Sequence, residues 1–296
     1  MKTLKPPRNY EEQIKRLVDD HNIMITDKDY AIQVLQKVNY YRLAGYGIGL
    51  MRKDDPEKYI DGISLEHLYR LHEFDSVFRN ELILVIESLE IRLRTQIAYQ
   101  LAMHYGSEGY VKRDNFNDKR TKSGASIHSM IIDNFRKECE RQKNVPFVKH
   151  HIENYDGHFP VWVAVELFSF GNLSSLYSIM KPEDQKAVAA YFSTSPKYLM
   201  SWILALVEVR NICAHYNRLY NMPLKQRPKL YKEYKRFQTG TLNKVFPVLL
   251  IIRRMCQDDP VWMDFLRASS TTINSYSDVI KLSFMGMPSD WLKILS

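Results

Sequence analysis

Apolar residues recur along most of the chain at intervals of three and four, which is the spacing of an amphipathic helix. The longest such run covers residues 64–104, with Ser64 placed to cap its start and Gly106 placed to end it. Its apolar positions are Leu68, Leu71, Phe74, Val77, Phe78, Leu82, Val85, Leu89, Leu93 and Ile97. A helix of this length spans roughly 60 Å, so a bend or break near Asp75 is an alternative to a single straight helix.

The opposite face of this helix carries four charged residues, Glu87, Glu90, Arg92 and Arg94. Opposite charges one turn apart usually form pairs in solvent, and we interpret these residues in that way. A helix this long could also serve a dimer interface.

Shorter periodic runs predict further helices. We expect them at residues 10–21, 27–38, 126–142, 160–168, 173–180, 182–192, 196–215, 242–256, 260–267 and 288–295. Gly171 and Asn172 are expected to break the chain before 173, residues 45–49 to form a tight turn, and residues 107–125 to form a loop. The prediction is an all-α protein, with residues 1–60 as an amino-terminal helical extension and residues 61–296 as the main helical domain.

The composition agrees with a compact protein of the cell interior. Only 11 glycines and 12 prolines occur, and 45% of residues are apolar, which disfavours both disorder and a turn-rich β fold. The three cysteines are far apart and form no C-x-x-C pair, so we expect no disulfide framework. The amino terminus has no apolar stretch suited to export, and the apolar run 248–252 is too short to cross a bilayer. We therefore expect a cytoplasmic protein without a membrane partner.

Residues 202–215 combine a buried helix face with a line of polar residues. The apolar positions are Trp202, Ile203, Leu206, Val207, Val209, Ile212 and Cys213. Glu208, Asn211 and His215 follow one another at i, i+3 and i+7 and so share one narrow stripe. Arg210 lies off that stripe, but its side chain is long enough to reach toward the histidine. Because polar side chains in such an apolar helix need partners or a cleft, this helix is the strongest candidate for a functional site.

The arrangement Arg210-Asn211-x-x-x-His215 resembles the R-x(4–6)-H signature of the HEPN ribonuclease superfamily. The longer run 206–221 more narrowly resembles the AbiD/AbiF-type abortive-infection proteins of bacteria. The resemblance extends to residues 5–7, 10–14, 39–46, 159–162 and 166–177, in the order of that family. The resemblance depends on these flanking segments, because the R-x-x-x-x-H spacing alone is not specific: Arg16 and His21 have it too.

The resemblance implies a HEPN-like helical bundle that cuts RNA without a metal or another cofactor. The ribose 2′-hydroxyl would attack the adjacent phosphate and leave a 2′,3′-cyclic phosphate and a 5′-hydroxyl. His215 would act as general acid or base, Arg210 as phosphate clamp and Asn211 as orienting residue. Glu208 and Glu166 would support them. Glu166 lies within the apolar run 161–168, where it could pair with Arg210, order His215 or only neutralise a core arginine.

The same resemblance implies a homodimer, with the two copies of the motif facing each other across a two-fold axis. It also implies a toxin of phage defence, and a small noncoding RNA as an antitoxin or regulator.

The net charge of +8 is concentrated in one region. Between residues 218 and 254 there are ten basic residues and one acidic residue, so this segment carries +9. Tyrosines and a phenylalanine alternate with the cations, a composition typical of proteins that bind single-stranded nucleic acid. The residues expected to bind RNA are Tyr216, Arg218, Lys225, Arg227, Lys229, Lys232, Lys235 and Arg236. The alternative for this segment is an ordinary solvated basic face.

Residues His150, His151, Glu153 and His158 have no further ligand at zinc-like spacing, so we expect no metal site there. Two alternatives to a ribonuclease remain open at this point. One is a non-catalytic HEPN-fold protein that holds a small RNA, and the other is a purely structural helical interaction module.

Overall fold

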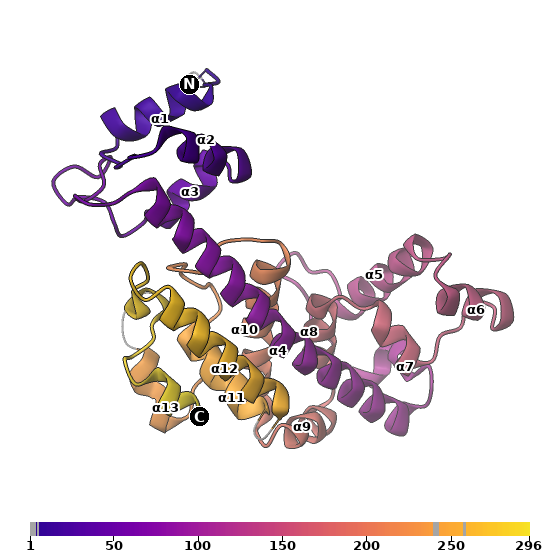
Figure 1. Cartoon of the computed structure of the whole chain (residues 1–296). Helices are drawn as coiled ribbons and strands as arrows, with labels where there is room; N and C mark the ends of the chain where they lie inside the picture. Colours follow the sequence, from indigo (N-terminus) through magenta and orange to yellow (C-terminus); the bar gives the residue numbers. More distant parts are fainter. Residues whose placement is uncertain (1–3, 5, 239–242, 257–258) are drawn as a thin grey trace.

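The computed structural model describes residue 4 and residues 6–238, 243–256 and 259–296 (Figure 1). Over these residues the chain forms α-helices and short 3-10 helices, and no β-strand occurs among them. The all-α prediction is therefore confirmed for this part of the chain.

The long helix α4 (Leu65–Tyr105) is the element around which the other helices are arranged. It runs for 41 residues without a break, crosses most of the molecule in Figure 1 and packs in turn against α-helices from both ends of the chain. The Ser64 side chain accepts the N–H of His67 at 3.0 Å, and Gly106 ends the helix with a φ of 79°. The predicted start and end are confirmed, whereas the alternative of a break near Asp75 is wrong.

Three short helices form the amino-terminal part and gather at the first turns of α4 (Figure 1). They are α1 (Tyr10–Asp19), α2 (Lys28–Lys37) and α3 (Tyr40–Tyr46). Asn9 and Glu12 form a capping box on α1, and the Asp27 side chain caps α2 by accepting the N–H of Tyr30 at 3.0 Å. The expected turn is confined to the residues after α3, because 40–46 are helical.

The middle of the chain contains α5 (Ile127–Arg141), α6 (Pro146–Asn154), α7 (Val161–Ala164), α8 (Phe170–Ile179) and α9 (Pro182–Tyr191). Two predictions are wrong here. The helix expected at 160–168 is only the short α7 followed by a 3-10 turn, Val165–Leu167. Gly171 and Asn172 do not break a helix, because the Ser169 side chain accepts the N–H of Asn172 and starts α8 just before them.

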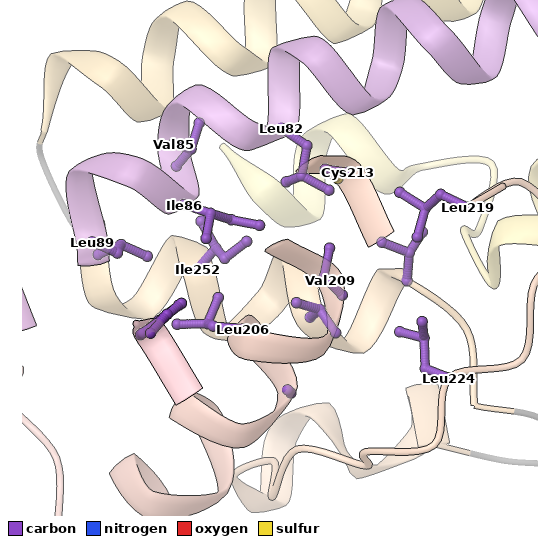
Figure 2. Close-up of a cluster of buried hydrophobic side chains, with 14 of the residues drawn as sticks. Leu82, Val85, Ile86, Leu89, Leu206, Val209, Cys213, Leu219, Leu224 and Ile252 are labelled. Carbon is purple, nitrogen blue, oxygen red and sulfur yellow. The ribbon is translucent and has the colours of Figure 1, made fainter. Parts of the chain in front are cut away.

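The carboxyl-terminal third contains α10 (Pro196–Ala214), α11 (Phe246–Cys256), α12 (Pro260–Ser275) and α13 (Trp291–Leu295). Part of the buried core lies between α4, α10 and α11, as Figure 2 shows. Its buried side chains include Leu82, Val85, Ile86 and Leu89 from α4, Leu206, Val209 and Cys213 from α10, and Ile252 from α11. Pro247 is tolerated in α11 because it lies in the first turn, where no helical N–H donor is lost.

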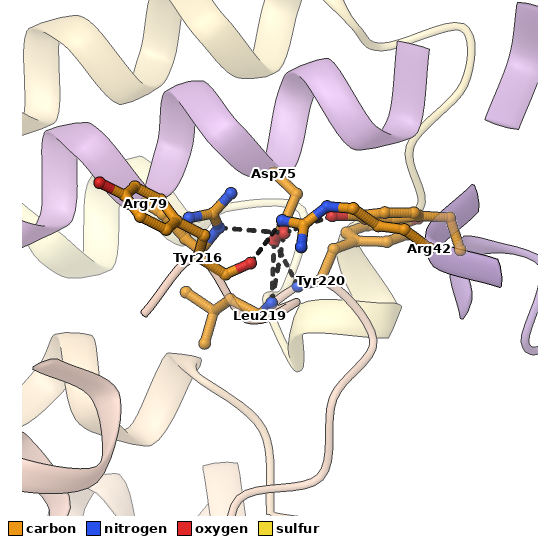
Figure 3. Close-up of polar contacts among 7 residues, drawn as sticks. Arg42, Asp75, Arg79, Tyr216, Leu219 and Tyr220 are labelled. Carbon is orange, nitrogen blue, oxygen red and sulfur yellow. Dashed lines mark hydrogen bonds and ion pairs between the residues drawn. The ribbon is translucent and has the colours of Figure 1, made fainter. Parts of the chain in front are cut away.

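Asp75 is a buried carboxylate that joins three parts of the chain (Figure 3). Its oxygens accept hydrogen bonds from the Tyr46 hydroxyl at 2.8 Å, from Nε of Arg79 at 3.2 Å and from the backbone N–H groups of Leu219 and Tyr220, the nearest contact of each being 3.1 and 2.6 Å. Burial raises the pKa of Tyr46, and the charge of Asp75 raises it further, so the hydroxyl stays a donor. This carboxylate therefore fixes α3 and the segment after α10 against α4.

We expect Asp75→Asn to lower the free energy of unfolding by about 3 kcal/mol, because it leaves the buried guanidinium of Arg79 without its counter-ion. The measurement is urea unfolding. Adding Arg79→Met to Asp75→Asn should recover part of the loss, since the uncompensated charge is then gone. Asp133→Asn is the matched control, because its ion pair with Arg136 lies in solvent and should matter little. Equal effects at the two aspartates would contradict the role given to Asp75.

Candidate active site at the end of helix α10

The sequence motif lies at the carboxyl end of α10, as predicted. Pro196 occupies the first turn, although Ser195 forms no capping hydrogen bond with its side chain. The helix ends at Ala214, and the N–H of His215 still donates to the Asn211 carbonyl at 3.0 Å. Tyr216 then takes a left-handed conformation with a φ of 56°, which turns the chain away. His215 is therefore exposed at the end of a rigid helix.

Arg210 projects from α10 toward α4, where an acidic residue holds it. Nε of Arg210 lies 3.3 Å from a carboxylate oxygen of Glu90, and the other oxygen of Glu90 is paired with Arg94. Arg94 also donates to the Val165 carbonyl. The Arg210 side chain remains 37% exposed, whereas that of Glu90 is 9% exposed. One buried carboxylate thus orients two guanidinium groups near the surface.

These groups border a surface pocket of about 260 Å³ between α4 and α10. Its lining residues are Ile83, Glu87, Glu90, Ile91, Arg94, Arg210 and Ala214. The interpretation of Glu90 and Arg94 as a solvated pair is therefore wrong, because the approach of Arg210 from another helix buries Glu90.

Glu166 is exposed on the 3-10 turn after α7, so the expectation of a buried charge there is wrong. The short α7 turns the chain earlier than a regular helix would, and this turn places the residue outside the core. The carboxylate that pairs with Arg210 is Glu90.

Glu208 faces away from Arg210 and holds the basic segment. Its two carboxylate oxygens accept the backbone N–H groups of Lys225 at 2.8 Å and Gln226 at 2.6 Å. Further along α10, the Ser201 hydroxyl accepts the N–H of Lys229 at 3.0 Å, and the Trp202 indole donates to the Lys229 carbonyl at 2.7 Å. The basic segment therefore runs alongside α10, with residue 229 beside its amino-terminal half and residue 225 nearer its carboxyl end.

Along this segment the cations point outward. Lys225, Arg227 and Lys229 are exposed, whereas Leu224, Pro228 and Leu230 are buried beneath them. Lys232, Lys235 and Arg236 continue as exposed residues on a 3-10 helix, Lys232–Gln238. These six cations lie on the surface as the sequence predicts, while Arg218 is half-buried.

Most of the aromatic residues of this region pack inward. Tyr220 is buried, Tyr231 stacks on Tyr198 with ring centroids 4.4 Å apart, and Phe237 packs edge-on against Phe246. Tyr216 is the exception, with 69% of its surface exposed. Base stacking by the buried or packed rings is therefore excluded, and only Tyr216 is placed to stack on a base.

Two segments that are far apart in the sequence meet at the end of α10. Arg42 of α3 donates to the Tyr216 carbonyl, and the Asn221 amide donates to the Ile48 carbonyl at 2.7 Å. Together with the Tyr46 hydroxyl on Asp75, these contacts dock the amino-terminal helices onto the residues that follow His215. The position of the imidazole thus depends on both halves of the chain.

Within a single chain, Arg210 and His215 point in different directions. At about 100° per residue, five steps along a helix place two side chains roughly 140° apart. Asn211 is exposed one turn before His215. Neither Arg210 nor His215 is sealed in an apolar pocket, so both can reach a ligand at the surface.

Among the described residues, no group of three or more His, Cys, Asp or Glu side chains could hold a metal ion. In the same part of the chain, no helix is both long enough and apolar enough to pass through a membrane.

Glu90, Arg94 and Asp75 were not identified from the sequence as parts of the site. Asp75 and Arg79 do show a signal, since they form an i,i+4 charge pair on the same face as Leu71, Phe78 and Leu82. The sequence signal for Glu90 is weaker, because its partner Arg210 is 120 positions away in the chain and no local spacing connects the two residues.

Comparison with known proteins identifies one family. A family model described as Abi-like protein matches residues 33–221, which is more than half of the chain. The match includes α3, α4 and all of α10 and ends at Asn221. No curated protein and no solved structure matches the chain.

We expect Glu90→Gln to lower the free energy of unfolding by about 1–2 kcal/mol, because Arg94 and Arg210 both lose their shared counter-ion while Arg210 remains partly solvated. Urea unfolding tests this. Glu87→Gln is the matched control, since Glu87 borders the same pocket but is exposed. If both substitutions have the same small effect, Glu90 does not hold the two arginines.

Proposed function

The chain belongs to the Abi-like protein family, and on this premise we propose that it is a metal-independent endoribonuclease of the HEPN superfamily that acts as an abortive-infection toxin in phage defence. The observation that carries the proposal is the end of α10, where an exposed imidazole follows a partly exposed guanidinium whose position is set by a buried carboxylate. Histidine suits proton transfer, and an oriented arginine suits a phosphate that gains negative charge.

In the proposed reaction, the 2′-oxygen of a ribose attacks the adjacent phosphorus and the bond from phosphorus to the 5′-oxygen breaks. The proton of the 2′-hydroxyl passes to a base, and the 5′-oxygen receives a proton as it leaves. His215 serves as the acid or base, Arg210 stabilises the charge on the phosphate oxygens, and Asn211 orients the reacting groups. The products are a 2′,3′-cyclic phosphate and a 5′-hydroxyl.

The exposed cations along α10 support RNA as the substrate. Lys225, Arg227 and Lys229 form a row that follows the helix toward the end that carries His215, and Tyr216 offers one exposed ring beside it. A positively charged row binds the phosphates of a flexible strand without regard to sequence. A small noncoding RNA that restrains the toxin would bind through the same row.

We also propose that the active form is a homodimer. Val77, Leu84 and Ile91 lie seven residues apart on α4 and are 39%, 61% and 54% exposed, which is unusual for three apolar side chains on one helix face. Ile91 also borders the pocket that contains Arg210. A second copy on this face would cover the apolar residues and bring both motifs to one groove, which suits side chains that diverge within one chain.

The second candidate is a non-catalytic RNA-binding protein with the same fold. One observation favours it, namely that Glu90 already neutralises Arg210 and so competes with a substrate phosphate.

Cleavage of RNA distinguishes the two candidates. Labelled single-stranded RNA incubated with the purified protein in EDTA should yield fragments with cyclic phosphate ends, and His215→Ala or Arg210→Ala should reduce the rate at least about 100-fold. His21→Ala is the matched control, because His21 ends the other R-x-x-x-x-H sequence and should leave the rate unchanged. RNA that is bound by the wild type but never cut would favour the non-catalytic protein. If the variants fail to fold, the motif is structural.

Light scattering coupled to gel filtration tests the dimer. We expect wild type at twice the chain mass, and the double substitution Leu84→Glu with Ile91→Glu at the monomer mass, because charges replace the apolar contact. Met130→Glu is the control, since Met130 is similarly exposed on α5 and lies outside the proposed interface. A wild-type monomer at high concentration, or a double variant that stays dimeric, would rule out this interface.

A further inference from the structure

Two basic side chains, Arg218 and Lys244, are half-buried, and the charge of Arg218 acts on Lys244. Burial lowers the pKa of Arg218, while the charge of Asp75 acts in the opposite direction. Burial also lowers the pKa of Lys244, and the positive charge of Arg218 lowers it further. The protein therefore places two like charges near each other at some cost in free energy.

The contacts of the described residues offset this cost only in part. Nη1 of Arg218 is buried and has no hydrogen-bond partner in the described part of the chain, and Nη2 makes only a long contact of 3.9 Å to the sulfur of Met222. The carboxylate that acts on Arg218 is Asp75, whose oxygens already accept from Arg79, Tyr46 and two backbone N–H groups. An unpaired donor on a buried cation is costly unless a ligand completes it.

Residues from several parts of the chain lie close to these two cations. A side chain at Gly45 would contact Nε of Arg218 at 3.7 Å, so α3 approaches the guanidinium closely. Nζ of Lys244 donates to the Asn221 side-chain oxygen at 2.8 Å, and the Asn221 amide donates to the Ile48 carbonyl. Gly49 lies against Asn221, where an added Cβ would come within 3.2 Å of the amide nitrogen. The amino-terminal part, the segment after α10 and Lys244, two residues before α11, thus meet at Asn221.

We propose that Arg218 and Lys244 form a binding site for one phosphate group of RNA, completed by the segment that carries Asn221. A phosphate at the exposed part of these side chains supplies a charge-assisted acceptor and offsets the repulsion between the two cations. The site lies three residues after His215, so a bound phosphate holds the strand beside the end of α10. This inference rests on the proposed function for its choice of RNA, and only the anion chemistry follows from the contacts themselves.

The binding experiment uses fluorescence anisotropy with a short single-stranded RNA that carries 2′-O-methyl groups and therefore cannot be cut. Lys244→Met removes the charge and keeps the buried stem, and Arg218→Gln removes the second cation. Each variant should bind about tenfold more weakly than wild type at 0.1 M salt, and the slope of log K against log salt should flatten by about 0.7. Lys137→Met on α5 is the matched control, because Lys137 is exposed and distant in the chain, and it should bind like wild type.

Two probes identify the source of the phosphate. One RNA probe carries a 5′-hydroxyl and the other carries a 5′-monophosphate. If the site binds a terminal phosphate, wild type should bind the monophosphate probe more tightly, by the same factor by which Lys244→Met weakens its binding. Equal binding of both probes, with the loss in Lys244→Met retained, assigns the site to an internal phosphodiester.

A thermal unfolding series separates this proposal from the proposed ribonuclease function. Inorganic phosphate, compared with chloride at equal ionic strength, should raise the melting temperature of wild type and of Lys137→Met but not of Lys244→Met. Lys244→Met removes a like charge and also the hydrogen bond to Asn221, so the melting temperature of each variant without phosphate serves as its own reference. The proposal is overturned if phosphate stabilises Lys244→Met as much as wild type, if it stabilises neither, or if the two substitutions leave RNA affinity and salt slope unchanged. A protein that binds RNA through this site and never cuts it would overturn the ribonuclease alone.

Discussion

The arrangement of the site depends on the buried carboxylate of Asp75. A single ionised group is stable inside a core only when several donors surround it, and here they come from α3, from α4 and from the backbone after α10. The core between the helices is made of apolar contacts that tolerate small shifts. Four directed hydrogen bonds to one carboxylate do not tolerate such shifts, so they set the position of the chain that follows His215.

Helix α10 uses its two sides for different purposes. One side carries Arg210 to the buried Glu90 of α4, and the other carries Glu208 to the backbone of the basic segment. In each contact both carboxylate oxygens have a partner. Those of Glu90 pair with guanidinium groups, and those of Glu208 accept backbone N–H groups. The helix thus lies between a pocket and a row of exposed cations, and its apolar residues pack in the core.

Much of this architecture could be predicted from the chain alone because it depends on local rules. The long helix, its start at Ser64 and the helix that carries Arg210 and His215 follow from apolar spacing and capping residues. The early start of α8 was missed although Ser169 is a local capping signal. The short α7 could not be predicted, because packing overrides the weak local preferences of the residues around Glu166. The inward packing of Tyr231 and Phe237 was missed for the same reason, since aromatic residues suit both a base and a core.

By itself, the sequence determined the all-α class, the helix that bears the motif and the excess of positive charge after it, since each is a property of neighbouring residues. The tertiary structure alone decided which acid meets Arg210, which side of α10 the basic segment follows and which cations are left without a partner. Glu90 and Arg210 are 120 positions apart, and the contacts between α10 and the basic segment join residues 17 to 28 positions apart. Long-range contacts of this kind are selected by the packing of whole helices, and no periodicity in the chain records them.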